Sequence, residues 1–331
     1  MSIERRLAFE GARFDNTRAL KLRADERVSV SGTSFSQSVS LRVESPTFHA
    51  SAACFERGAD VLLQPGGQGD FASASFLGPS LIATMPGGGP PAKISPLDGT
   101  RIERLVLQAL DLSECTFGRL HRLDGLLISG RGQLSLAPSV VDGSYRREVL
   151  ADEVVRRSHN LRPMLSWAPV AWNHPAALEE KWPPASSGSI ADIYRAMRKA
   201  REDSADYPGA TDFYYGEMEM RREGADNWVE RLLLTGYWVL SGYGMRAART
   251  LAAYVVLVLL IAAGLQAFGL QDPPSFWHTA AWTLTDSISL VRPTEHLDLT
   301  AAGMYLNFTI RIIGPALIAL IVFALRSRVR R

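Results

Sequence analysis

Two long apolar segments near the C-terminal end constrain this chain more than any other feature. Thr250 to Leu270 contains 21 residues without a charge, which as a helix is long enough to cross a hydrocarbon core of about 30 Å. The second segment, residues 301–325, is followed by a basic tail that begins at Arg326. Backbone groups in lipid are satisfied only inside a helix or a closed barrel. The sequence therefore predicts a two-pass membrane protein.

The distribution of arginine predicts the orientation. Arg246 and Arg249 precede the first segment and four arginines follow the second, whereas the loop 271–302 contains only Arg292. The positive-inside rule then places both termini in the cytoplasm. The opening MSIERRLAFE has no apolar h-region, so no cleaved signal peptide is expected. Cys54 and Cys115 are expected to be free, buried thiols in a reducing compartment.

Residues 1–136 contain short strand-like runs separated by glycine-rich turns. Large apolar residues recur there at every fifth position, and the longest run is Ile102, Leu107, Leu112 and Phe117. A five-residue period fits neither a helix nor a flat strand. It suits a square-sectioned coil in which each side contributes one inward side chain and stacked coils share a core. The alternative is an irregular β-sandwich in which the spacing arises by chance.

Residues 100–130 resemble a degenerate pentapeptide-repeat segment. The stretches FYYGEMEMRR (213–222) and SGYG (241–244) are similar to parts of actinobacterial pentapeptide-repeat membrane proteins. This resemblance implies a right-handed quadrilateral β-helix, a β-solenoid, joined to a helical membrane module, and it implies no catalytic residues. With the orientation above, it implies a location in a bacterial cytoplasmic (inner) membrane. The chain departs from the repeat at Leu105 and Leu110, where a small residue is expected.

The region between the solenoid and the first apolar segment is expected to contain a connector and then helices. Residues 137–188 are rich in proline and tryptophan, which is typical of an extended linker. Residues 189–245 are predicted to form cytosolic and interfacial helices, with Ser189 and Asp212 as N-caps and a break at 207–209. The last of these helices, residues 228–243, carries aromatic residues typical of a membrane interface, namely Tyr237, Trp238 and Tyr243.

The loop within the membrane module (246–331) contains a further helical pattern at residues 273–292. Trp277 and Trp282 would anchor a helix lying on the outer leaflet, which is the interpretation we favour. The alternative is a re-entrant pore helix, because span, short helix, span is the order of parts in a potassium-channel pore. The SGYG sequence precedes the first span, so it is expected to form an elbow and not an ion filter.

Arg311 is the candidate functional residue of the membrane module. Only 14 uncharged residues separate it from the basic tail, about 21 Å of helix, which places its charge at bilayer depth. Three arrangements are open: the side chain extends to the headgroups, pairs with Asp286, or lines an aqueous path. Gly314 and Pro315 follow it and could kink the helix as a hinge.

The sequence favours a binding protein over an enzyme. It contains no catalytic triad pattern, phosphate-binding loop or Cys/His array, and its net charge of +2 indicates no nucleic-acid surface. His278 and His296 are isolated, so we expect no metal site and no cofactor. We expect a membrane-tethered scaffold whose solenoid binds an unidentified cytosolic protein. The alternative is a channel-like homo-oligomer gated by its cytosolic domain; the lipid bilayer is a partner in both.

Overall fold

The protein forms two compact units, Met1–Gly224 and Ala225–Arg331, in a computed structural model. The structure describes residues 5–130, 133–137, 146–159, 184–245, 247–288 and 298–329. Most of the predicted connector, together with Arg246, Arg292 and His296, lies outside the described residues. The unit boundary falls inside the predicted helical region 189–245, because its last helix belongs to the second unit.

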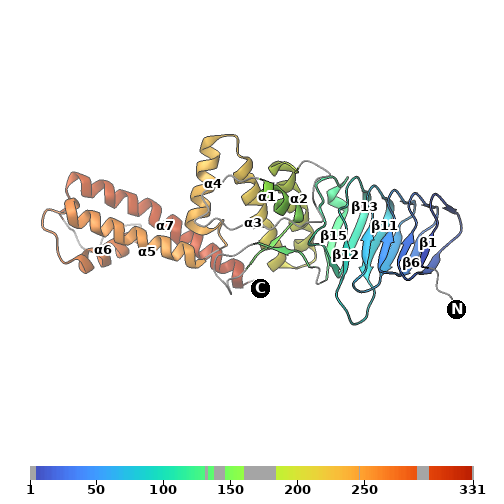
Figure 1. Cartoon of the computed structure of the whole chain (residues 1–331). Helices are drawn as coiled ribbons and strands as arrows, with labels where there is room; N and C mark the ends of the chain where they lie inside the picture. The colour runs from blue at the N-terminus through green and yellow to red at the C-terminus, as the bar shows by residue number, and fades with distance from the viewer. Residues whose placement is uncertain are drawn as a thin grey trace. The chain divides into compact units, whose positions relative to one another are not determined.

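The first unit begins with a β-solenoid of about six turns, whose strands stack as successive coils (Figure 1). One sheet has the order β1 (Arg6–Ala8), β4 (Arg27–Ser29), β7 (Thr47–His49), β10 (Gln68–Asp70), β12 (Ala92–Ile94) and β14 (Leu110–Asp111). The other has the order β2 (Arg13–Phe14), β5 (Ser34–Phe35), β8 (Cys54–Phe55), β11 (Ser75–Thr84), β9 (Ala59–Leu63), β6 (Val39–Glu44) and β3 (Ala19–Arg23). Strand β13 (Arg101–Gln108) pairs with β11 and with β15 (Leu126–Ser129). All these pairings are parallel.

A ladder of phenylalanine rings fixes the register of the coils. Phe14, Phe35, Phe55 and Phe76 occupy equivalent positions on β2, β5, β8 and β11. Their rings stack with centroid distances of 5.1, 5.2 and 4.9 Å. Identical inward side chains on successive coils bury one continuous core, as expected for a solenoid. The prediction of a solenoid is confirmed, and the β-sandwich alternative is wrong.

The five-residue run contributes to the same core. Ile102, Leu107, Leu112 and Phe117 are each at most 1% exposed. Leu105 and Leu110, which depart from the repeat, also face inward and are buried. The larger side chains are accommodated within regular strands, since both residues lie in parallel ladders.

Three helices follow the solenoid, namely α1 (Ala151–His159), α2 (Ser187–Asp203) and α3 (Tyr207–Gly224). Residues of α2 and α3 belong to the same hydrophobic core as the solenoid. A short 3-10 helix, η1 (Leu123–Gly125), precedes β15, and β16 (Ser135–Leu136) pairs antiparallel with β17 (Glu148–Val149). The N-cap of α2 is Ser186, whose hydroxyl accepts from the Ser189 N–H at 3.1 Å, so the prediction of Ser189 as the cap is wrong. Helix α3 starts at Tyr207, so the predicted break at 207–209 is wrong. Pro208 is accommodated there because proline is tolerated in the first turn of a helix.

The second unit is helical. It comprises α4 (Trp228–Ser241), α5 (Ala247–Gly264), the π-helical turn η3 (Leu265–Gly269), α6 (Phe276–Ile288) and α7 (Ala301–Val329). The segments Ala247–Gly269 and Ala301–Val322 are long and apolar enough to cross a membrane, in agreement with the two predicted spans.

Gly269, in the turn η3 after α5, and Gly303, near the start of α7, lie against each other at one end of the helical unit. A Cβ on Gly303 would lie 2.0 Å from the Gly269 carbonyl oxygen. We call this end the loop end.

Candidate functional sites

An ion pair connects α6 to α7 in the membrane module. Arg311 donates from Nε and Nη2 to the two carboxylate oxygens of Asp286, at 2.9 and 2.7 Å. The Asp286 side chain is 1% exposed and that of Arg311 is 37% exposed. Of the three arrangements open from the sequence, the structure has the pair with Asp286. A two-bond arginine–carboxylate contact fixes geometry as well as charge.

The same face of α6 is lined with polar side chains. Thr279, Thr283, Asp286 and Ser287 recur at helical spacing, and each is at most 2% exposed. The Thr279 hydroxyl donates to Gln266 Oε1 at 2.9 Å, and the hydroxyls of Tyr254 and Ser287 are 2.6 Å apart. Helix α6 is therefore joined to α5 and α7 through hydrogen bonds and an ion pair.

Gly314 allows the close contact between α7 and the end of α6. A Cβ on Gly314 would lie 2.9 Å from Ser287 Cβ and 3.3 Å from its carbonyl oxygen. Any side chain at this position would push the helices apart. Pro315 lies inside α7, and the helix continues on both sides of it. The role of these two residues as a hinge stays a prediction.

The aromatic residues predicted as interfacial anchors have different environments. Tyr243 is fully buried against Tyr237, with ring centroids 5.8 Å apart, and Trp282 is 6% exposed. Trp238 is partly exposed and lies under the Arg249 guanidinium, 4.9 Å from its ring centroid. Trp277 is 74% exposed. Among the two tryptophans of α6, only Trp277 has a ring available to the surroundings.

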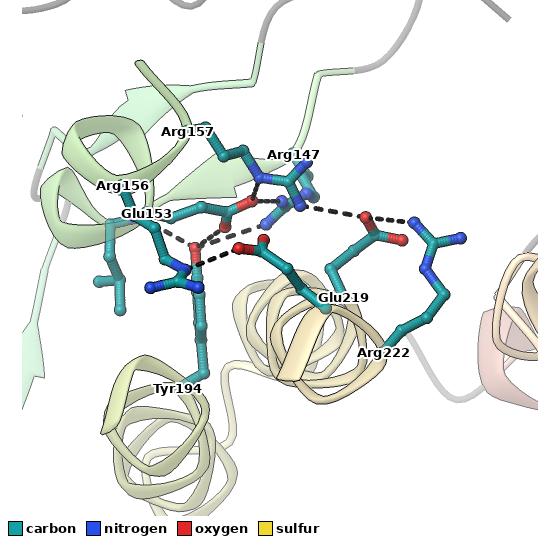
Figure 2. A network of polar contacts seen from close by, with 9 residues as sticks. Arg147, Glu153, Arg156, Arg157, Tyr194, Glu219 and Arg222 are labelled. Atoms are coloured by element: carbon teal, nitrogen blue, oxygen red, sulfur yellow. Dashed lines mark hydrogen bonds and ion pairs between the residues drawn. The ribbon is translucent and has the colours of Figure 1, made fainter. Parts of the chain in front are cut away.

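A buried charge network lies between α1, α2 and α3 in the first unit (Figure 2). The Glu153 side chain is fully buried and accepts from Arg147 at 2.5 Å and from the Tyr194 hydroxyl at 2.5 Å. Arg157 lies 2.7 Å from the same carboxylate and 3.1 Å from Glu219. One carboxylate therefore has three partners: Arg147 and Arg157, which are close to it in the chain, and Tyr194 on α2.

Electrostatics keeps Glu153 ionised. Burial alone would raise the pKa of Glu153, but the positive charges of Arg147 and Arg157 outweigh this and lower it. Burial, and then the neighbouring Glu153 carboxylate, raise the pKa of Tyr194, so its hydroxyl stays protonated as a donor. With Glu153 and Tyr194 fully buried, the network serves to hold helices together.

Sequence reasoning missed this network and misjudged the helix that contributes to it. The sequence GEMEMRR (216–222) predicts that Glu217 and Glu219 pair with Arg221 or Arg222 on a solvated helix face. Glu217 does pair with Arg221 at 2.8 Å, and Glu219 with Arg222 at 3.0 Å, but the two carboxylates are only 3% and 8% exposed. The expectation of a solvated face is wrong, because α2 and the segment around α1 cover this side of α3. The i,i+4 spacing of Glu153 and Arg157 and the i,i+3 spacing of Glu219 and Arg222 were its local signals.

Asp152 links α1 to the last part of the solenoid. Its two carboxylate oxygens accept from the backbone N–H groups of Phe117 and Gly118, at 2.9 and 2.8 Å. Burial raises the pKa of Asp152 to about 6, although both N–H donors favour the anion. Asp212 makes a similar link from α3, because its carboxylate accepts from the Glu148 N–H at 3.0 Å. The prediction that Asp212 is the N-cap of a helix is wrong, since α3 starts at Tyr207.

Cysteine and histidine form no metal centre in the part of the chain that the structure describes, where no group of three His, Cys, Asp or Glu residues could hold a metal ion. Both cysteines are free. Cys115 is buried as expected, but the expectation that Cys54 is buried is wrong, because its side chain is partly exposed.

Comparisons with protein-family models, with curated proteins and with solved structures found no match to this chain. The resemblance to pentapeptide-repeat membrane proteins therefore depends on the residues quoted for it. The structure itself shows a β-solenoid followed by helices, two of which are long and apolar enough to span a membrane.

Proposed function

We propose that this protein is a membrane-tethered interaction module, in which the solenoid binds a protein partner and α5 and α7 anchor it in the bilayer. Both termini lie on the cytoplasmic side of a bacterial membrane in this proposal, because the basic residues flank the two spans on that side. The coils are degenerate pentapeptide repeats, an assignment supported by the five-residue spacing of their buried residues.

The observation that carries the proposal is a row of aliphatic side chains on the outside of the solenoid. Leu81, Val106 and Leu127 are paired in register on β11, β13 and β15, and all three point outward and remain partly exposed. Leu81 pairs with Asp60 on β9, and Leu62 lies two residues after Asp60 on the same strand. Leu62 is therefore a diagonal neighbour of Leu81 on the same face of the sheet. We call these four residues the aliphatic row. Neighbouring strands are about 4.8 Å apart, so their side chains form one continuous strip.

On the earlier strands of the same sheet, the outward positions in this register carry no large apolar side chain. The positions in register with Leu81 on the earlier strands are Asp60, Ser40 and Ala19, and all three are exposed. Outward positions of a sheet that faces water are normally polar. Contiguous apolar surface on a soluble domain is typical of a protein-binding site. The change from small or polar residues to large aliphatic ones along the sheet therefore supports a docking surface over β9, β11, β13 and β15.

Site-specific photo-crosslinking tests this docking surface. A photoreactive residue at position 106 of the full-length protein, in membranes of the cell that produces it, should give a discrete adduct, whereas the same residue at position 40 should give none. Leu127→Asp should reduce the adduct at position 106 severalfold, because a charge in an apolar contact must be desolvated. Equal adducts at positions 106 and 40, or an adduct of twice the chain's own mass, would contradict a separate partner.

A channel-like homo-oligomer is the second candidate, and the Asp286–Arg311 pair favours it. The Arg311 side chain is 37% exposed in a helix that is apolar enough to span a membrane. Charged groups at membrane depth usually face a bundle interior or water. The native mass of the full-length protein in a mild detergent discriminates, since one two-span subunit cannot enclose a path for ions. A monomer would exclude the channel, and a ring of four or more would make Arg311 a pore candidate for ion-flux measurements.

A further inference from the structure

Helix α6 has the polarity of a helix surrounded by an apolar medium. Its buried side is mostly polar, with Thr279, Thr283, Asp286 and Ser287. Its exposed side carries large apolar groups: Trp277 is 74% exposed, Leu284 is 42% exposed and Ile288 is 61% exposed. A helix on the surface of a protein in water has the opposite arrangement. The side chains of α6 are therefore distributed as if lipid, and not water, surrounded them.

The two polar residues on the exposed side are consistent with this environment. The Thr285 hydroxyl donates to the Trp282 carbonyl at 2.8 Å, so its polar group is satisfied within the helix. His278 lies in the first turn of α6, next to the segment that follows the loop end. Polar groups in hydrocarbon need an internal partner, whereas those near the headgroups do not.

The contacts of Ser287 show how far α6 reaches along the bundle. Gly303 and Gly269 touch at the loop end, and Ser287 touches Gly314 of α7 and Tyr254 of α5. At 1.5 Å per residue, Gly303 to Gly314 is about 17 Å, and Tyr254 to Gly269 is about 22 Å. The length of α6 itself, 13 residues, is about 20 Å. These lengths agree, so α6 runs from the loop end to a level beyond the middle of a core of about 30 Å.

We propose that α6 is a re-entrant membrane helix. It enters the hydrocarbon from the loop end, presents Trp277, Leu284 and Ile288 to lipid acyl chains, and brings Asp286 to Arg311 near the middle of the bilayer. The inference depends on α5 and α7 crossing a membrane and not on what the solenoid binds. It replaces the favoured sequence interpretation, a helix lying on the outer leaflet.

A groove between α5 and α6 identifies the lipid partner as an acyl chain. It has a volume of about 280 Å³, and Val255, Val258, Leu259, Ala280, Ala281 and Leu284 line it together with Tyr254 and Trp277. The lining is apolar except for the Tyr254 hydroxyl, which is hydrogen-bonded to Ser287, and the indole N–H of Trp277. A groove lined almost entirely by hydrocarbon and aromatic groups, on the outside of two membrane helices, fits a hydrocarbon chain better than a charged headgroup.

A depth profile from spin labels tests the re-entrant helix. Single cysteines replace Ser275, Ala281, Leu284 or Ile288 in the full-length Cys54→Ala protein, which is reconstituted in phosphatidylcholine vesicles; these four positions are exposed, so the labels do not disturb packing. Buried Cys115 serves as the unlabelled background. The ratio of oxygen to nickel-chelate collisions should rise from position 275 to 288 and should be severalfold higher at 288 than at 275. Leu260→Cys, on α5 at 65% exposure, is the reference for a position in lipid.

Each other outcome overturns the proposal in a distinct way. Equal, shallow depths at 281, 284 and 288 would place α6 on the membrane surface. Frequent nickel collisions at 288 with few at 260 would place this face of α6 in water, as in a channel. Frequent nickel collisions at 260 as well would show that α5 is not in lipid, and would remove the membrane anchor along with the re-entrant helix.

Discussion

Glu153→Gln should lower the free energy of unfolding of the first unit by about 3–5 kcal/mol, the cost of removing one partner from a buried ion pair. Glutamine keeps the size of the side chain but removes the charge that Arg147 and Arg157 share. Total stability of a domain is only about 5–15 kcal/mol, so the loss is a large fraction of it. Urea unfolding and limited proteolysis of the full-length protein in detergent would measure the effect.

Glu26→Gln is the matched control. Glu26 pairs with Arg6 at 3.0 Å, but the two side chains are 45% and 72% exposed. Exposed pairs contribute about 0–1 kcal/mol, so this variant should unfold almost like the wild type. If Glu153→Gln and Glu26→Gln shift the urea midpoint equally, the buried network does not hold the helices together.

The pH dependence provides a second readout for Glu153. Its pKa is lowered in the folded state from an ordinary value of 4.5, so ionised Glu153 stabilises the fold above that pH. This contribution is lost as the pH falls below 4.5 through the folded-state pKa. The wild type should therefore lose its stability advantage over Glu153→Gln on acidification, and the gap between them should stay constant above about pH 6.

Arg311→Leu should destabilise the membrane module by about 3 kcal/mol, because it leaves Asp286 buried at 1% exposure without a counter-charge. The expected result is a lower midpoint of thermal unfolding in detergent and a smaller fraction of monodisperse protein. Arg328→Leu, the same substitution in the basic tail of the same helix, should have little effect. Equal and mild effects of the two variants would contradict a structural role for the ion pair.

A double variant separates the loss of the pair from the loss of arginine itself. Asp286→Asn with Arg311→Gln keeps a hydrogen-bonding pair and removes both charges together. It should be more stable than Arg311→Leu, because neither partner is left as an isolated charge. If the double variant is as unstable as Arg311→Leu, the arginine is needed for a contact other than Asp286.

The solenoid and the two long apolar helices could be predicted because their signals are local. The run from Ile102 to Phe117 repeats every five residues, and each of its apolar residues is buried. The spans are visible as length and composition, which depend on no contact elsewhere in the chain. The starts of α2 and α3 were misplaced, because several serine, aspartate and proline residues nearby are each competent to begin a helix.

The partners of the charged residues could not be predicted in the same way. Tyr194 meets Glu153 across 41 residues, and Arg157 meets Glu219 across 62. In the sequence these groups have the same composition as a solvated helix face. Only the packing of α1, α2 and α3 excludes water from them, and exclusion of water is what makes the charges depend on one another.

The sequence by itself determined that the chain has a coiled β region, two apolar segments long enough to span a membrane, and a charge inside the second of them. Only the tertiary structure decided that Arg311 meets Asp286, 25 residues away, and that the polar side of α6 faces inward. Periodicity reports that a helix has two different faces. Which face is buried depends on the elements and the medium that surround the helix, and neither is written in the local pattern.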